Sequence, residues 1–408
     1  MDAEASRGTV LFSNVAHSFT HLALMLYPTV VLALENVFPL DYGALMALSV
    51  PGFVLVGAGA LPAGWLGDRW SATGMMAVFF FGLGGACIVT GLAPSPFMLA
   101  VGLALIGLFA AIYHPVGIAL IVRSARNRGR ALGVNGVFGG MGMAAAGFVA
   151  GGLTEGLGWR WAFIVPGVVI VATGVLFLAF LRRGNVAVAE RPTVAPQTET
   201  PVGRSEAMRG MIVLAVAIVG TGLLDNATSV ALPKIFAERT AGWLGGGVLD
   251  AGLLFTVVYA VGASMQLVGG WVADRFPHRL VYILCYLMQV PLLLAAAGLG
   301  GPALVLAMIV FVSMNTGMQP TENLLLMRYS PARWRATAYG AKFVLAFGAS
   351  SLAVPMVALI HEATGGFTWF YVGLAAIAAT VLVAALCLPG GRPAAEVSPI
   401  PQQATGMR

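Results

Sequence analysis

The sequence predicts an all-α membrane protein in which twelve transmembrane helices form two six-helix bundles related by a pseudo-twofold axis. Of the 408 residues, 59% are hydrophobic and 9% are charged. The charged residues lie in clusters between apolar runs of about twenty residues, the length that a helix needs to cross a bilayer. Most of the 22 Lys and Arg residues lie in alternate loops or in the two tails. A charged turn also occurs twice, at equivalent places in the two halves of the chain.

The repeated turn gives the clearest sign of duplication. Its two copies read Gly64-Trp65-Leu66-Gly67-Asp68-Arg69-Trp70 and Gly270-Trp271-Val272-Ala273-Asp274-Arg275-Phe276. In each copy an apolar run ends at Gly-Trp, and a second apolar run follows Asp-Arg. Other residues match at a separation of 205 positions, namely Pro28 with Pro233, Pro115 with Pro320, Arg123 with Arg328, Arg128 with Arg333, and Arg130 with Arg335. Matches over the whole length predict a parallel six-plus-six repeat around a central cavity.

The apolar runs define the expected helices and domains. In the first half we expect helices over about 10–34, 43–66, 74–93, 97–122 and 131–154, and a sixth that follows Trp159-Arg160-Trp161 and ends at Arg182. In the second half we expect them over about 209–236, 248–273, 279–299, 302–327, 336–361 and 367–388. Residues 1–183 then form an N-terminal bundle, 184–207 a flexible cytoplasmic linker without helical periodicity, 208–390 a C-terminal bundle, and 391–408 a disordered tail.

The distribution of charge indicates the location and the partners. A net charge of +6 could suggest nucleic acid, but the basic residues mark alternate loops, which is typical of the cytoplasmic side of a membrane protein. We therefore expect a multi-pass protein of the bacterial inner membrane with both termini in the cytoplasm. Its cysteines, Cys87, Cys285 and Cys387, lie in apolar runs and are expected to be buried thiols. We expect a monomer that contacts lipid and a small-molecule substrate and contains no cofactor.

Three features of the sequence resemble the major facilitator superfamily. The Asp-Arg turns resemble its loop between the second and third helices, and the glycines between Gly133 and Gly152 resemble its antiporter motif, with Phe148 in place of the proline. Tyr113-His114-Pro115-Val116-Gly117 resembles the fosmidomycin-resistance-like branch, with Val116 in place of a Glu. The resemblance implies a secondary active transporter that works by alternating access and lines its cavity with helices 1, 4, 7 and 10.

Polar residues on these four helices are the candidate substrate ligands. They are His17, His21, Tyr113, His114, Asn226, Asn315 and Gln319. His17, His21 and Met25 recur every four residues and so share one helix face. The repeat places His21 opposite Asn226 and His114 opposite Gln319, so that polar side chains of both halves face one cavity. The alternative is that each histidine only bonds to a neighbouring helix.

Two acidic residues within apolar runs, Asp225 and Glu322, are the candidates for proton coupling. A charged side chain at mid-membrane costs about 2.5–3.5 kcal/mol on insertion scales, so such residues usually have a use. Asp225 could instead join two helices by a hydrogen bond, and Glu322 could pair with an Arg in a gate. Lys342 could neutralise Glu322, reach an anionic substrate or extend toward the cytoplasm. The candidate gating residues are Asp68, Arg69, Asp274, Arg275, Arg130, Arg335 and Lys342.

The spacing His17-x3-His21-x3-Met25 leaves an alternative function open. Imidazole and thioether ligands together suit copper, so import of a transition metal or a metal chelate is possible. No Cys or Met cluster on the seventh helix completes such a site, and we assign no metal ligands. A membrane sensor or enzyme is a further alternative, but the chain contains no Gly-x-Ser-x-Gly, His-Glu-x-x-His or Walker motif. We therefore expect no enzymatic activity.

Overall fold

The computed structural model of this chain describes residues 3–125, 128–183, 203–331 and 335–389, and within these ranges it contains helices and no strand. In the first half the helices are α1 (Ala3–Leu34), α2 (Tyr42–Ala47), α3 (Val50–Arg69), α4 (Ala72–Gly91), α5 (Pro96–Ala110), α6 (Tyr113–Ser124), α7 (Arg128–Leu157) and α8 (Trp161–Arg182). In the second half they are α9 (Arg204–Arg239), α10 (Val248–Ala273), α11 (His278–Ala296), α12 (Gly301–Gly317), α13 (Gln319–Tyr329), α14 (Arg335–Thr364) and α15 (Thr368–Leu386).

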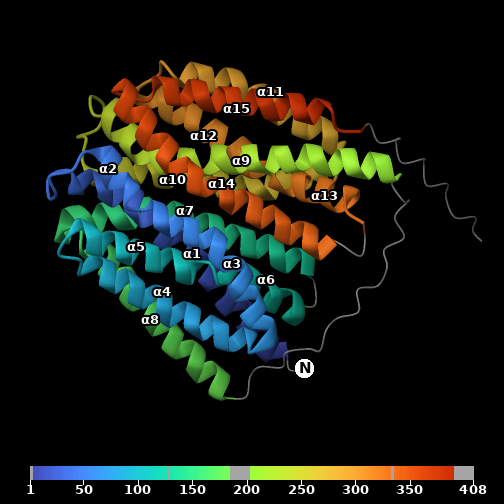
Figure 1. Cartoon of the computed structure of the whole chain (residues 1–408), viewed down its shortest axis with the longest axis horizontal. Coiled ribbons are helices and arrows are strands. Elements are labelled where there is room, and N and C mark those ends of the chain that lie inside the picture. The colour runs from blue at the N-terminus through green and yellow to red at the C-terminus, as the bar shows by residue number, and fades with distance from the viewer. Residues whose placement is uncertain (1–2, 126–127, 184–202, 332–334, 390–408) are drawn as a thin grey trace, which may run out of the picture.

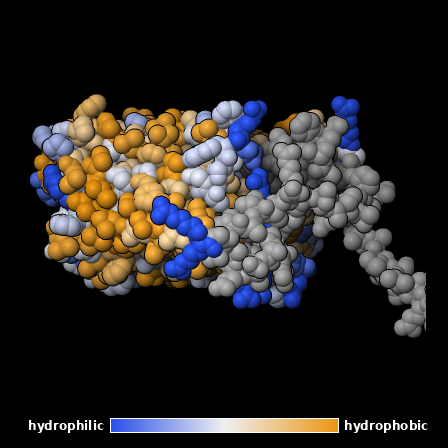
Figure 2. Space-filling view, turned by 90° about the horizontal axis from the view of Figure 1, so that it is seen from below, coloured by the Kyte–Doolittle hydropathy of each residue, from blue (hydrophilic) through white to orange (hydrophobic). Residues whose placement is uncertain are grey.

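These helices form twelve segments that are long and apolar enough to cross a membrane, which confirms the predicted number. Three of the segments consist of two consecutive helices each: α2 with α3, α5 with α6, and α12 with α13. Large apolar side chains such as Leu61, Phe97 and Leu306 are largely exposed. Figure 2 shows that apolar residues cover a broad belt between two hydrophilic zones. An apolar belt of this kind is stable in lipid, where the helices satisfy their own backbone hydrogen bonds.

The helices pack as two bundles, one from each half of the chain (Figure 1). In the first bundle α1 packs against α7, and α4 against α8. In the second bundle α9 packs against α14, and α11 against α15. The two bundles meet along α7 and α10 and, in the corresponding place of the repeat, along α3 and α14. The predicted architecture of two six-helix bundles with a pseudo-twofold relation is therefore confirmed.

The expected second, fourth and tenth helices, 43–66, 97–122 and 302–327, are each interrupted, so the prediction of continuous helices was wrong there. The second helix is interrupted at Leu48 and Ser49. The fourth is interrupted at Ala111 and Ile112, and the tenth at Met318. Pro115 and Pro320 follow closely, and a proline cannot donate a hydrogen bond to the carbonyl four residues before it. Interrupted helices at matching places of two repeats are typical of the substrate-binding region of transporters.

Two helices begin earlier than the apolar runs predict. The first begins at Ala3 rather than near residue 10, and α9 begins at Arg204 rather than near 209. A helix can extend beyond the lipid because its backbone bonds do not depend on apolar side chains, and Glu206 favours the positive end of the α9 dipole. Residues 184–202 and 390–408 lie outside the described residues, so the expected linker, tail and domain boundaries stay predictions.

The glycines of α7 allow the two bundles to approach closely. A Cβ placed on Gly140 or Gly147 would collide with α10. Toward one end of the seam, the backbone N–H of Leu249 donates to Glu155 Oε1 at 2.8 Å. Toward the other end, a Cβ placed on Gly133 would meet no described atom within 4 Å. We call the end near Gly133, which also carries the two Asp-Arg turns, the basic end, and the end near Glu155 the opposite end.

Candidate solute-binding site

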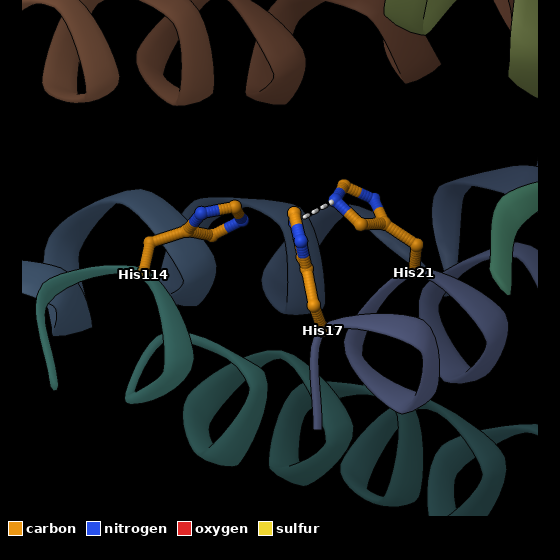
Figure 3. A group of neighbouring side chains, drawn as sticks. All are labelled: His17, His21 and His114. Carbon is orange, nitrogen blue, oxygen red and sulfur yellow. Dashed lines mark hydrogen bonds between the residues drawn. The ribbon is translucent and has the colours of Figure 1, made fainter. Parts of the chain in front are cut away.

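Three histidines from two helices converge in the first bundle (Figure 3). His17 and His21 lie one turn apart on α1, and His114 lies in the first turn of α6, directly after the interruption before Tyr113. The Nε2 atoms of His17 and His21 are 3.2 Å apart. The His114 ring centroid lies 5.3 Å from that of His17 and 5.6 Å from that of His21. Figure 3 shows that all three rings point away from their helices, toward helices of the second half.

Asn135 on α7 holds this histidine cluster in place. Its backbone carbonyl accepts a hydrogen bond from His17 Nδ1 at 2.7 Å. Its side-chain Nδ2 lies 2.6 Å from the Tyr113 hydroxyl and donates to Asn14 Oδ1 at 3.0 Å. The Tyr113 ring stacks on His17 with centroids 4.7 Å apart and an angle of 18°. Gly139 leaves room for the His17 ring, because any side chain at that position would collide with it.

Sequence reasoning missed Asn14 and Asn135. Both are buried amides in helices that are otherwise apolar or glycine-rich. A buried amide needs hydrogen-bond partners, so an isolated Asn among the glycines of α7 was a usable signal. Its partners could not be read from the sequence, since 121 positions separate Asn135 from Asn14.

Asp225 and Asn315 form a second polar group, in the other bundle. Asn315 Nδ2 donates to Asp225 Oδ1 at 3.2 Å and thereby joins α9 to α12. Asn315 is buried, and among the described residues its Oδ1 has no hydrogen-bond partner. No Lys, Arg or His within the described ranges forms an ion pair with Asp225. The structure therefore contains the helix-joining bond that the sequence left open, but this bond does not neutralise the carboxylate.

Glu322 belongs to a third, separate group nearer the basic end. Its Oε1 lies 2.8 Å from Lys342 Nζ, and its Oε2 accepts from the Tyr282 hydroxyl at 2.7 Å and from Thr221 at 3.4 Å. Both charged side chains are mostly buried. Among the side chains that the structure describes, the ion-pair partner of Glu322 is therefore Lys342. A carboxylate with a cation and two hydroxyl donors is well compensated despite its burial.

The expected pairing of polar residues across the two halves is not made by direct contact. Asn226 Nδ2 donates to the Gly222 carbonyl of its own helix at 2.8 Å. Within the described part of the chain, no hydrogen bond joins His21 to Asn226, and the Gln319 side chain makes none. These side chains are partly exposed, so a solute could bind them.

The turns at the basic end contain contacts within each bundle. Asp68 Oδ1 lies 3.1 Å from Arg123 Nη2, and the Asp68 side chain is 69% exposed. Arg69 lies over the Trp65 ring, and Arg275 lies over the Trp271 ring. Asp274 is the exposed C-cap of α10, and Arg130 is exposed near the start of α7. The Arg335 side chain is outside the part that the structure describes. None of these contacts joins the two bundles.

The opposite end does carry an ion pair between the bundles. Lys234 on α9 lies 2.7 Å from Glu35, which follows α1, and 3.8 Å from Glu238. His361 on α14 bonds to Glu238 at 3.0 Å, and its ring packs on Tyr42 of α2. The sequence analysis did not predict the pairing of Lys234 and Glu35. Opposite charges at one depth on helices expected to face each other were the available signal.

Comparison with known proteins supports this architecture. The family model described as Major Facilitator Superfamily matches residues 14–355 and 214–406. The puromycin resistance protein pur8 of Streptomyces alboniger is 32% identical over 223 residues, which are 52% of this chain and 38% of that protein. An uncharacterised MFS-type transporter of Mycobacterium tuberculosis is 30% identical over 268 residues, which are 64% of this chain and 35% of that protein. The matched segment thus spans well under half of each relative.

Solved structures share the fold over nearly the whole chain. A bacterial homologue of the human lysosomal transporter Spinster, in an inward-facing and unoccupied conformation, has a TM-score of 0.72 at 15% identity and 95% coverage of both chains. A D-xylose-proton symporter has a TM-score of 0.71 at 14% identity, with 93% of this chain and 96% of that chain covered. At such identities the likeness concerns the fold alone. Together with the family match over most of the sequence, the twelve spans and the two bundles, it shows that this chain belongs to the Major Facilitator Superfamily, whose members are transporters and not enzymes.

Proposed function

We propose that this protein moves a small solute across the bacterial inner membrane by alternating access, coupled to protons. The main observation that supports this proposal is that buried polar groups lie beside helix interruptions at matching places of the two halves. His114 lies in the turn after the interruption between α5 and α6, and Asn315 lies just before the one between α12 and α13. Half-helix ends at such interruptions are where transporters of this general design bind solutes.

The orientation follows from the charges. By the positive-inside rule the basic end faces the cytoplasm, and both termini lie on that side. The Glu35–Lys234 pair joins the bundles at the opposite, outer end, whereas α7 is exposed at Leu132 and Val134 near the basic end. The ion pair at the outer end and the exposure of α7 at the basic end together fit an inward-facing conformation. We keep the expectation of a monomer.

The solute is proposed to bind between His21 and His114 of one bundle and Asn226, Asn315 and Gln319 of the other. Imidazoles and amides offer both donors and acceptors, which suits a solute with several polar groups. Relatives are named for puromycin resistance and multidrug resistance, so antibiotics are the first class to test. The likeness of residues 113–117 to the fosmidomycin-resistance-like branch adds fosmidomycin to the panel.

Asp225 is proposed to carry the coupling proton, with Glu322 as the alternative. Asp225 is a half-buried carboxylate within the membrane that has no cation beside it in the described part of the chain. Such a charge is costly, and binding a proton removes that cost. Glu322 already has Lys342 at 2.8 Å, so a proton there would break an ion pair. Protonation therefore removes an unpaired charge at Asp225 but breaks an ion pair at Glu322. This difference favours Asp225 as the residue that carries the coupling proton.

The test uses proteoliposomes loaded with a pH-sensitive dye. Addition of puromycin or another panel member should change the internal pH in wild-type vesicles and not in empty ones. His21→Ala and His114→Ala should each raise the apparent KM about tenfold or more, as expected for loss of a charged-group hydrogen bond of about 1.5–3 kcal/mol. His278→Ala is the matched control, because His278 bonds to the Ala273 carbonyl at the basic end. Unchanged KM with lowered stability in both site variants would instead assign the histidines to packing.

A further inference from the structure

We infer that His17, His21 and His114 form a binding site for a first-row transition metal ion. Imidazole nitrogens suit copper and zinc among these metals. This inference rests on the proposed function, because it assumes that the histidine cluster is part of the solute-binding site. It adds that the solute is a metal ion or a metal chelate. The sequence showed only two of these histidines on one helix face; His114 of α6 completes the set of three.

The spacing of the first two ligands matches a metal site. His17 and His21 stand four positions apart on α1, the spacing by which two helical histidines bind one zinc ion. Two nitrogens bound tetrahedrally at about 2.0–2.1 Å from a metal lie about 3.3–3.4 Å apart. The Nε2 atoms of His17 and His21 are 3.2 Å apart. A small opening of this pair would admit the ion.

The tautomer of His17 is the one that a metal ligand needs. The carbonyl of Asn135 can only accept, so the His17 Nδ1 carries the proton in their 2.7 Å hydrogen bond. The Nε2 lone pair of His17 therefore points at His21. Metal-binding histidines almost always donate their other ring N–H in this way. His21 Nε2 then carries a proton and donates it to His17 Nε2. When a metal ion binds between the two Nε2 atoms, the His21 proton moves to Nδ1, so that His21 stays neutral and its Nε2 lone pair binds the metal.

His114 supplies the third nitrogen from a different helix. The candidate ligand atoms of the three residues lie within 4.8 Å of one another. Two nitrogens bound to one tetrahedral metal ion are about 3.3 Å apart, so the His114 nitrogen must move roughly 1.5 Å toward the other two. Its place directly after the α5–α6 interruption allows such a shift without breaking a continuous helix. The hydrogen bond from His17 Nδ1 to the Asn135 carbonyl on α7 does not involve α6, so it can hold the His17 ring in place while His114 moves.

The charge of the cluster limits the form in which the metal binds. The cluster consists of three imidazoles and, in the described part of the chain, contains no carboxylate. A divalent ion held by three neutral ligands would keep its full charge inside the membrane, which is costly. The site should therefore bind Cu⁺, or a divalent ion that brings an anionic ligand in its fourth coordination position. This ligand would lie on the side that Figure 3 shows facing the second bundle.

Binding is tested on protein purified without a polyhistidine tag. Zinc chloride, with and without citrate, and Cu⁺ under reducing conditions are added in equilibrium dialysis. We expect one metal ion per chain, with affinity at least tenfold weaker in His21→Ala and His114→Ala. The double variant His278→Ala/His361→Ala is the matched control, because it removes the two other histidines of the chain and should bind as wild type. X-ray absorption of the zinc-loaded wild-type protein should show three imidazoles, a readout that needs no variant.

The outcomes separate this inference from the proposed function. Binding that requires citrate identifies a chelate, and binding of Cu⁺ alone identifies the free ion; either supports the site. Equal affinity in wild type and both site variants, or fewer than three imidazoles at the bound zinc, overturns it. Dye-reported proton flux with an antibiotic, in protein that binds no metal, also overturns the metal site while leaving proton-coupled transport in place.

Discussion

Replacing Lys234 by Met is expected to open the outer end of the protein. Lys234 on α9 bridges to Glu35 beyond α1 at 2.7 Å and so ties the two bundles together at that end. The side chains are 13% and 29% exposed, so water screens this pair only in part. The variant also leaves Glu35 and Glu238 near each other without the cation between them. All of these changes favour the conformation in which the outer ends have separated.

The size of the effect follows from the exposure of the pair. A hydrogen bond to a charged group contributes about 1.5–3 kcal/mol, and the partial exposure of Glu35 points to the lower limit. Because 1.4 kcal/mol corresponds to a factor of ten, the ratio of outward-open to inward-open protein should rise about tenfold. Glu35→Gln should produce a similar shift. The double variant should be no more open than the single variants, since both remove the same bond.

The assay measures access to a cysteine in the outer seam. Ala358→Cys places a thiol on α14 where the Ala358 carbonyl packs near Gly43 of α2, in a background without the native cysteines. A membrane-impermeant maleimide should label it about ten times faster in Lys234→Met than in the parent. Glu238→Gln is the matched control, because both ion-pair partners of Glu238 belong to its own bundle. An unchanged labelling rate in Lys234→Met, or equal acceleration in Glu238→Gln, would refute the gate.

Three further predictions concern the acidic residues. Asp225→Asn should abolish solute accumulation driven by a pH gradient but spare solute exchange; accumulation that persists in both this variant and Glu322→Gln would show that neither carries the proton. Asp68→Asn and Asp274→Asn should slow transport while changing stability by less than about 1 kcal/mol, because both side chains are exposed; normal transport rates at normal membrane levels would contradict a gating role. Lys342→Met should destabilise the protein by about 3–5 kcal/mol by leaving Glu322 buried without its cation, and adding Glu322→Gln should restore most of the melting temperature. A double variant as unstable as Lys342→Met would contradict this account.

The membrane fold could be predicted from the sequence because lipid leaves few choices. A backbone in hydrocarbon must satisfy its own hydrogen bonds, so each long apolar run becomes a helix. The interruptions at Ala111 and Met318 were also encoded, by Pro115 and Pro320, but an apolar run read by hydropathy alone hides them. The early start of α9 was hidden for the opposite reason, since its first residues are polar and still helical.

The site could be predicted only in part. Periodicity places His17 and His21 on one helix face, but it does not say which neighbouring helix that face meets. The contact of His17 with Asn135 depends on the rotation and tilt of α1 and α7, which are set by packing along their whole length. The same holds for Lys342, whose partner Glu322 was one of several alternatives until the packing of α13 and α14 fixed it.

The repeat duplicates the backbone but not the polar side chains. This difference explains how one half could bind the solute and the other half the proton. Both halves contain an interrupted helix, yet at the separation of 205 positions Asp225 corresponds to Thr20 and Glu322 corresponds to Gly117. The histidine cluster has no counterpart either, since His114 corresponds to Gln319. Among the candidate solute-binding and proton-coupling residues, the imidazoles thus lie in the first bundle and the carboxylates in the second. If the solute binds mainly to the first bundle and the proton to the second, rocking changes the distance between them, so protonation in one bundle can alter solute affinity in the other without direct contact between the two sites.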